Sequence, residues 1–173
     1  MSNINDLNFK EQLKQIKAFV FDVDGVLSSS EIHILADGEL ARTTNVKDGF
    51  AIIRAIEEGY ILGIISGGKS EAVAKRYRKL GIHSVTIGST DKMKDFENFL
   101  NTYQLTASQV LYVGDDLPDI EVMKQCAIAC CPADAVEDVK AIALYISGHE
   151  GGKACVRDVI AQVMKTQKTW YKQ

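Results

Sequence analysis

The sequence predicts an α/β fold in which a mostly parallel β-sheet lies between layers of helices. Short β-branched runs alternate with helical patterns along the 173 residues, and this alternation is typical of βαβ units with right-handed crossovers. The β-branched runs contain no polar alternation, which indicates strands that are covered on both faces. Apolar residues make up 46% and charged residues 25% of the chain, so the composition is that of an ordinary globular protein.

The apolar runs are the expected strands of this sheet: Ile16–Phe21, Tyr60–Ile65, Ser84–Ile87, Val110–Val113, Ala127–Cys130 and Leu144–Ile146. Amphipathic patterns predict the helices: Gly49–Glu58, Ser70–Leu80, Lys92–Tyr103, Leu117–Gln125, Ala135–Ile142 and Gly152–Lys165. Gly81 follows the second of these helices at the position of a C-terminal cap. No repeat or linker interrupts the pattern, so we expect residues 1–173 to form one domain with a polar C-terminal tail at about 166–173.

One segment, residues 31–46, departs from the alternation. Glu31–Leu35 and Glu39–Val46 are both β-prone, and Ala36-Asp37-Gly38 joins them. An Asp-Gly pair between such runs predicts a hairpin turn. We therefore expect a β-hairpin that protrudes directly after the first strand of the sheet.

Composition and charge exclude several classes of protein. The formal net charge is −3 and the isoelectric point is near 5.6, so no basic excess is available to neutralise nucleic-acid phosphates. Residues 1–15 lack the basic-then-apolar pattern of a secretion signal, and no apolar run is long enough to span a bilayer. We therefore expect a cytoplasmic protein that binds neither nucleic acid nor a membrane.

The four cysteines, Cys126, Cys130, Cys131 and Cys155, form no Cys-x-x-Cys pair. Cys130 and Cys131 are neighbours, so their side chains should point to opposite faces of a strand. We interpret the cysteines as packing residues, because a free cysteine usually behaves as a small buried hydrophobic side chain.

Polar residues follow four of the predicted strands, where ligands bind in open α/β sheets. They are Asp22 and Asp24 after the first strand, Ser66, Gly67 and Gly68 after the second, Lys92 beyond the third, and Gly114, Asp115 and Asp116 after the fourth. Taken singly, each group has an ordinary interpretation as a turn, a loop, a solvated lysine or a helix cap. Their occurrence together at one edge of the sheet predicts a site for a phosphate group beside a divalent cation.

The residue types fit phosphate-ester hydrolysis. Asp22 is the predicted nucleophile, which would form an aspartyl-phosphate, and Asp24 is the predicted acid and base for the two steps. The carboxylates of Asp22 and Asp115, with the backbone carbonyl of Asp24, are the predicted Mg²⁺ ligands. Ser66 and the backbone of the glycines after it would bind phosphoryl oxygens, and Lys92 would neutralise their charge.

These residues resemble, in order, the four motifs of the haloacid dehalogenase superfamily. The matching segments are Asp22-Val-Asp24-Gly-Val-Leu27, Ile65-Ser66-Gly67, Lys92 and Gly114-Asp115-Asp116-Leu-Pro-Asp119. The resemblance covers residues 17–159, and an aspartate at position 24 is similar to the phosphatase branch. It implies a three-layer, Rossmann-like fold and the same roles for Asp22, Asp24, Ser66, Lys92 and Asp115. It also implies that Asp116 and Asp119 support the metal site.

Two further segments, Asn45–Gly49 and Gly151–Asp158, resemble the family of 3-deoxy-D-manno-octulosonate 8-phosphate phosphatases. This resemblance implies Mg²⁺-dependent release of phosphate from that sugar (KDO) phosphate, in the synthesis of lipopolysaccharide precursors. The candidate substrate contacts are Lys47, Asp48, Lys69 and Lys153. The lysines are candidates because a keto-acid carboxylate calls for a cation.

The short spacing leaves no room for a cap domain over the site. Only 41 residues separate Asp24 from Ser66, and the hairpin and one helix occupy most of them. The resemblance implies that such capless members form tetramers around their hairpins. We therefore expect a homotetramer in which neighbouring subunits complete each pocket.

Position 68 leaves the substrate open. Octulosonate phosphatases usually carry an arginine there, and their nine-carbon relatives often carry an acid, whereas this chain has Gly68 followed by Lys69. An N-acylneuraminate or deaminated (KDN) 9-phosphate is therefore an alternative substrate. A non-catalytic oligomerisation module is the alternative from another class, and the intact catalytic motifs argue against it.

Overall fold

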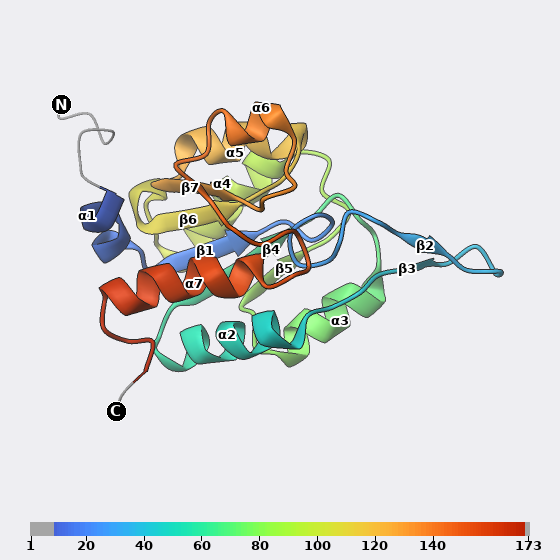
Figure 1. The fold of residues 1–173 in the computed structure, drawn as a ribbon, viewed down its shortest axis with the longest axis horizontal. Helices are drawn as coiled ribbons and strands as arrows, with labels where there is room; N and C mark the ends of the chain where they lie inside the picture. Colours follow the sequence, from blue (N-terminus) through green and yellow to red (C-terminus); the bar gives the residue numbers. More distant parts are fainter. Residues whose placement is uncertain (1–8, 172–173) are drawn as a thin grey trace.

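The predicted α/β fold is confirmed in the computed structural model, which describes residues 9–171 (Figure 1). Six strands form one sheet in the order β5-β4-β1-β6-β7-β8, and every neighbouring pair is parallel. The strands are β1 (Ala18–Phe21), β4 (Ile61–Ile65), β5 (Ser84–Thr86), β6 (Val110–Val113), β7 (Ile128–Cys131) and β8 (Tyr145–Ile146). The chain starts in the middle of the sheet and builds outward in both directions, so the carboxyl end of β1 lies at the switch point where open α/β sheets bind ligands.

Helices cover both faces of this sheet, and the sheet divides the hydrophobic core into two halves (Figure 1). One face carries α1 (Phe9–Gln15), α2 (Val46–Glu57), α3 (Glu71–Lys79) and α7 (Cys155–Thr166). The other carries α4 (Lys92–Tyr103), α5 (Ile120–Gln125) and α6 (Glu137–Lys140). Along β1, Phe19 packs in the first half of the core and Val20 in the second, as the alternation of side chains along a strand requires.

The boundaries of several helices differ from the predictions, and α7 begins at Cys155 rather than Gly152. The helix α2 begins at Val46, because Asn45 caps it by accepting the Lys47 backbone N–H at 2.9 Å. The segment predicted as Leu117–Gln125 is a 3₁₀ turn, Leu117–Asp119, that leads into α5. The helix α6 spans Glu137–Lys140 and is shorter than predicted.

The helix α1 was not predicted from the sequence. It buries Leu13 and leaves its other faces largely polar. A residue far away in the sequence holds it in place. The Gln167 side chain, which follows α7, donates hydrogen bonds to the carbonyls of Leu13 and Ile16, both at 2.8 Å. These bonds satisfy carbonyl groups that the end of a helix leaves without partners.

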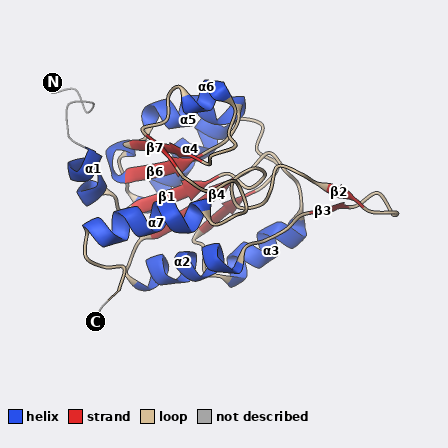
Figure 2. Cartoon of the chain, in the orientation of Figure 1, coloured by secondary structure: helices blue, strands red, loops and turns tan. Residues whose placement is uncertain are grey.

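The hairpin is present, but its strands are much shorter than predicted. They are β2 (His33–Ile34) and β3 (Leu40–Ala41), which pair with each other and not with the main sheet. Gly38 has φ +83° in the turn, a conformation that glycine adopts readily. The hairpin projects well beyond the helices and the sheet (Figure 2), so no neighbouring strand extends its pairing.

The cysteines pack as predicted. Cys130, Cys131 and Cys155 are buried, Cys126 is half-buried, and all are free thiols. Cys130 lies in the half of the core under α7 and Cys131 in the half under α5, so these neighbours do point to opposite faces of β7. Burial raises the pKa of the Cys131 thiol to about 11, which keeps it protonated at neutral pH.

The predicted polar tail is folded onto its own chain up to Trp170, and residues 172–173 lie outside the described part. The Tyr60 hydroxyl donates to the Gln167 side chain at 2.8 Å. Trp170 packs against the first half of the core and covers the Arg157 guanidinium, whose central carbon lies 5.1 Å from the ring centroid. None of the helices in residues 9–171 combines the length and the apolar character that a membrane crossing requires.

The start of α7 is tied to the start of α2 by buried polar contacts. Asp48 is 2% exposed and accepts the Arg157 backbone N–H at 2.7 Å. Asn45 donates to the Gly152 carbonyl at 3.0 Å, and the Gly152 N–H donates to the Val26 carbonyl at 2.8 Å. The loop before α7 is thereby fixed against the loop that follows β1.

Removing the Asp48 acceptor should destabilise this junction. We expect Asp48→Ala to lower the free energy of unfolding by about 1–2 kcal/mol, because backbone donors at the start of α7 lose their capping group. Asp48→Asn keeps the acceptor oxygen and should retain most of that stability. Urea denaturation of both variants, with the exposed Asp138→Ala as a control, measures the difference. Equal stability of all three would show that Asp48 does not act as a cap.

Candidate active site

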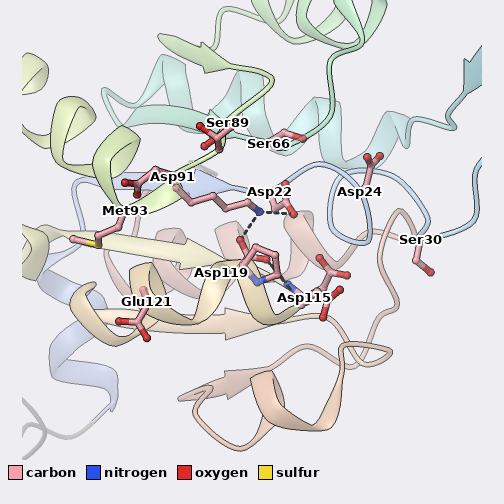
Figure 3. Close-up of a pocket in the computed structure, with 15 residues that line it drawn as sticks. Asp22, Asp24, Ser30, Ser66, Ser89, Asp91, Met93, Asp115, Asp119 and Glu121 are labelled. Carbon is pink, nitrogen blue, oxygen red and sulfur yellow. Dashed lines mark hydrogen bonds and ion pairs between the residues drawn. The ribbon is translucent and has the colours of Figure 1, made fainter.

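The loops after the central strands enclose one pocket at the carboxyl edge of the sheet. Its volume is about 730 Å³. The residues predicted for the catalytic site line it together: Asp22, Asp24, Ser66, Gly67, Lys92, Asp115, Asp116 and Asp119. Figure 3 labels five of them, Asp22, Asp24, Ser66, Asp115 and Asp119. The sheet therefore brings to one place groups that are spread over nearly 100 positions of the sequence.

Lys92 lies between two buried carboxylates at the base of the pocket. Its Nζ is 2.8 Å from Asp22 Oδ2 and 2.7 Å from Asp119 Oδ1, and both contacts are drawn in Figure 3. Burial alone lowers the pKa of Lys92, but the two neighbouring carboxylates raise it above its ordinary value. The residue is therefore a fixed cation beside the predicted nucleophile. Lys92 is the first residue of α4. Asp91, the N-cap of this helix, accepts the Lys94 N–H at 3.0 Å.

Asp119 is fully buried and organises the loop around it. In addition to Lys92, it accepts the Tyr112 hydroxyl at 2.6 Å and the backbone N–H of Asp115 at 3.2 Å. Its oxygens are thus engaged by the protein. Asp119 therefore lies where it can support the neighbouring loop. Tyr112 is a second residue of this hydrogen-bond network, and the sequence does not reveal it, because an inward-facing tyrosine in a strand looks like an ordinary core residue.

The Asp22 side chain is buried and poised in a single orientation. It is 8% exposed, and its Oδ1 accepts the Val23 backbone N–H at 2.7 Å. Burial, then the charge of Asp119, raises the pKa of Asp22 to about 6, against the lowering effect of Lys92. Even so, the carboxylate is largely ionised at neutral pH, as a nucleophile must be.

The donor set at the base of the pocket fits a divalent cation. Oxygen atoms of Asp22, Asp115 and Asp119 all lie within 4.8 Å of one another, and the buried Asp115 Oδ1 has no hydrogen-bond partner within residues 9–171. Burial, then the charges of Asp22 and Asp119, raises the pKa of Asp115 to about 8. Clustered carboxylates of this kind are the ligands that Mg²⁺ takes in proteins.

Backbone close to this cluster is packed too tightly for a side chain. Gly25 has φ +85°, and a Cβ there would clash with the Asp115 carboxylate. A Cβ on Gly151 would in turn clash with the Gly25 carbonyl. The loop before α7, which was singled out by its resemblance to the octulosonate phosphatases, therefore contributes by fixing the backbone beside the carboxylates.

The raised pKa values predict how stability depends on Mg²⁺ and pH. Asp22 and Asp115 have folded pKa values of about 6 and about 8 in the metal-free protein, above those of the unfolded chain. Their contribution to the stability of the metal-free protein is therefore lost as pH rises through these values. Because Mg²⁺ needs the ionised carboxylates, its stabilising effect should grow with pH by at most ~1.4 kcal/mol per pH unit for each proton released.

Thermal unfolding with and without excess MgCl₂, at a pH below and a pH above this window, measures this effect. We expect a clearly larger Mg²⁺-induced shift at the higher pH. The Asp115→Asn variant should show a much smaller shift at both. A shift that is independent of pH would contradict the assignment of these carboxylates as the cation site.

Ser66 and Gly67 also line the pocket. Ser66 is 3% exposed, and its hydroxyl accepts the Gly68 N–H at 3.1 Å. Its backbone is fixed to the loop after β5, because the Ser89 N–H donates to the Ser66 carbonyl at 2.9 Å. Ser89 also lines the pocket and donates from its side chain to Asp95 at 2.6 Å. Ser66 and Lys92 thus line the same pocket, in which the sequence predicts a phosphate.

Asp24 is paired with a residue that sequence reasoning missed. Arg42, directly after β3, donates from Nε to Asp24 Oδ1 at 2.5 Å and from Nη2 to Asp24 Oδ2 at 3.0 Å. Ser28 donates to the same Oδ1 at 3.2 Å. Figure 3 shows Asp24 to one side of the cluster formed by Asp22 and Lys92. Nothing in the sequence around Arg42 indicates that it pairs with Asp24.

The predicted substrate contacts are mostly not brought into this pocket by the chain itself. Asp48 is buried and accepts the Arg157 backbone N–H at the start of α7, and it does not line this pocket. Lys47 lies in a separate groove beside His149 and Arg157, and Lys153 is exposed and does not line the pocket. Lys69 lines a groove next to Arg42.

The parallel sheet and the carboxylates, lysine and serine at its switch point define a phosphoric monoester hydrolase, and comparisons with known proteins agree. Residues 78–160 match the model of the haloacid dehalogenase-like hydrolases. The chain is 32% identical over 157 residues to the 3-deoxy-D-manno-octulosonate 8-phosphate phosphatase KdsC of Yersinia pestis, covering 91% of this chain and 84% of the relative. It is 33% identical over 154 residues to KdsC of Escherichia coli strain K12, covering 89% and 82%.

Solved structures give the same result. The octulosonate phosphatase of Yersinia pestis has a TM-score of 0.90 at 32% identity, covering 93% of this chain and 87% of that one. The enzyme of Moraxella catarrhalis, in complex with magnesium, phosphate and KDO, has a TM-score of 0.90 at 30% identity, covering 93% and 92%. The chain belongs to the haloacid dehalogenase-like hydrolases, in the family of the 3-deoxy-D-manno-octulosonate 8-phosphate phosphatases.

Proposed function

We propose that this chain hydrolyses 3-deoxy-D-manno-octulosonate 8-phosphate to KDO and phosphate, with Mg²⁺ as cofactor and an aspartyl-phosphate at Asp22. The observation that carries the proposal is the buried Asp22 carboxylate, held 2.8 Å from Lys92 at the base of a pocket with further carboxylates. The KDO and phosphate in the related Moraxella catarrhalis structure support the substrate. We further propose that the whole chain is one phosphatase domain that acts in the cytoplasm, in the supply of KDO for lipopolysaccharide.

In the first step, Asp22 attacks phosphorus while Ser66 and Lys92 hold the phosphoryl oxygens. The bond from phosphorus to the sugar oxygen breaks, and Asp24 donates a proton to that oxygen as it leaves. A Mg²⁺ ion held by Asp22, the Asp24 carbonyl and Asp115 supplies screening of the charge between carboxylate and phosphate.

In the second step, Asp24 takes a proton from a water molecule that attacks the same phosphorus. The bond between phosphorus and the Asp22 carboxylate breaks, inorganic phosphate leaves, and Asp22 is regenerated as a carboxylate. Asp119 takes no part in bond making. It holds Lys92 and the backbone of Asp115 in place, and Asp116, the N-cap of the 3₁₀ turn, fixes the same loop.

The substrate is tested by measuring phosphate release from the eight-carbon and nine-carbon keto-acid phosphates side by side, with Mg²⁺. We expect the larger kcat/KM for the octulosonate 8-phosphate. The nine-carbon ester remains the second candidate, because Gly68 provides no side chain to contact either sugar. Release from neither ester would contradict the proposed function and favour a non-catalytic module.

We also propose that the protein is a homotetramer whose subunits cover one another's pockets through the hairpin. The hairpin exposes large apolar side chains, with Ile34 at 78% and Leu40 at 49%, and exposed apolar patches of this kind favour association. Light scattering coupled to size-exclusion chromatography should give four times the chain mass of 19.0 kDa. Leu40→Glu should lower the assembly state, and a wild-type monomer would contradict the proposal.

A further inference from the structure

Arg42 is the cation closest to the predicted acid and base, and it comes from the hairpin rather than from a catalytic motif. Its side chain is 8% exposed, although it follows a strand that is only partly covered. It makes a two-pronged ion pair with Asp24, at 2.5 and 3.0 Å. Such a fork matches the geometry of a carboxylate and is among the stronger polar interactions in proteins.

This pair is incompatible with the first chemical step. Both Asp24 oxygens accept from Arg42, and one of them also accepts from Ser28. With both of its oxygens accepting hydrogen bonds from Arg42, Asp24 has neither oxygen free to contact a leaving oxygen, which proton transfer requires. Asp24 therefore has to leave Arg42 during turnover, and the buried guanidinium then needs another anionic partner.

Gly68 leaves the space that this pair occupies. A Cβ at position 68 would lie 3.3 Å from Asp24 Oδ2, 3.4 Å from Ser66 Oγ and 3.6 Å from Arg42 Nη2. Even the Cβ of an alanine at position 68 would therefore be in close contact with Asp24. Because position 68 has no side chain, there is room for the Arg42 guanidinium next to it.

The other side of Arg42 faces a groove with room for a sugar acid. The groove has a volume of about 440 Å³ and contains a second cation, Lys69. It also contains Glu39 and Glu71, and Glu71 accepts from Arg78 at 3.4 Å. An anionic group that reaches Arg42 from this groove would meet two cations next to the phosphate pocket.

We propose that Arg42 recognises the carboxylate of an acidic sugar phosphate and, by exchanging Asp24 for that carboxylate, releases Asp24 for proton transfer. The inference rests on the proposed function and adds to it the residue that selects keto-acid esters over esters without a carboxylate. Arg42 contributes both to binding and to the chemical step, since an ester without a carboxylate leaves the Arg42–Asp24 pair closed.

The test compares Arg42→Gln with the wild-type chain on two esters, 3-deoxy-D-manno-octulosonate 8-phosphate and D-arabinose 5-phosphate, which has no carboxylate. We expect the wild type to prefer the acidic ester. In the variant, kcat/KM for the acidic ester should fall by roughly 10- to 100-fold, the value of a lost charged contact. Hydrolysis of D-arabinose 5-phosphate should stay the same or rise, because Asp24 is no longer held.

Arg42→Lys and Arg54→Gln complete the comparison. Arg42→Lys keeps the charge without the fork, so we expect an intermediate preference, and it serves as the test if Arg42→Gln does not fold. Arg54 pairs with Glu57 and Glu58 away from the pocket, so its replacement should leave the preference unchanged.

The outcomes separate this inference from the proposed function. An equal fall for both esters in Arg42→Gln would show that Arg42 is merely structural and would overturn the inference, as would an unchanged preference or a wild type with no preference. In each of these cases the wild type still hydrolyses the octulosonate ester, so the proposed function stands. Hydrolysis of neither ester by the wild type would overturn both.

Discussion

Replacing Asp22 with asparagine is expected to lower kcat by at least ~10⁴-fold, because the amide has the shape of the carboxylate but is not a nucleophile. The variant should fold normally. Asp22 is buried near Asp115 and Asp119, so removing its charge relieves repulsion between like charges in the metal-free protein. Lys92 keeps Asp119 as a partner at 2.7 Å.

Phosphate release and thermal unfolding measured on the same preparation distinguish this result from misfolding. We expect Asp22→Asn to have lost activity while its metal-free melting temperature is unchanged or higher. Asp138→Asn, an exposed aspartate of α6, should be fully active. Substantial turnover by Asp22→Asn would mean that another group attacks phosphorus.

Replacing Lys92 with methionine is expected to damage both stability and activity. The substitution leaves Asp22 and Asp119 buried side by side without their shared cation, and breaking a buried ion pair costs about 3–5 kcal/mol. It also removes a cation from the phosphate pocket, for which we expect kcat/KM to fall by ~10²–10³-fold. Excess Mg²⁺ should recover part of the stability, since it supplies positive charge to the same carboxylates.

Lys94→Met is the matched control, because Lys94 lies on the same helix and is exposed. Urea denaturation with and without MgCl₂, together with phosphate release, gives the comparison. Similar stability of the two variants would show that the Lys92 contacts with Asp22 and Asp119 contribute little to folding.

Much of the fold and the placement of the catalytic motifs could be predicted, since both depend on local pattern. A continuous apolar run predicts a strand covered on both faces, and the residue after it then lies at the edge where parallel strands end. For this reason Asp22, Ser66 and Asp115 were located without a structure. The short hairpin strands were overestimated, because β-propensity at an exposed position is not supported by packing.

Contacts that depend on how distant segments meet could not be predicted. The Arg42–Asp24 pair spans 18 positions and depends on the direction in which the hairpin leaves β1. The hydrogen bond between Asp48 and the start of α7 spans 109 positions. From the sequence, Asp48 is an acidic residue in the first turn of α2, where the helix dipole alone explains its presence. The prediction for Lys47 depends on the resemblance of its segment and on its charge, which do not reveal the groove that it lines, beside His149 and Arg157.

The missed helix α1 is a different case. Phe9, Leu13 and Ile16 are spaced four and three residues apart, which is the pattern of one helix face. The signal was present, but the surrounding residues are polar and the helix is only seven residues long. A helix of this length is not stable on its own, and here the Gln167 side chain completes its end.

The central claim is that Asp22 becomes phosphorylated during hydrolysis of a sugar phosphate. It is tested most directly by acid-quenching the enzyme during turnover, reducing it with borohydride, which converts an aspartyl-phosphate to homoserine, and sequencing the peptides by mass spectrometry. We predict homoserine at position 22 when substrate and Mg²⁺ are both present, and none without substrate or in Asp22→Asn. Conversion at a different aspartate, or steady phosphate release with no conversion at position 22, would contradict the mechanism.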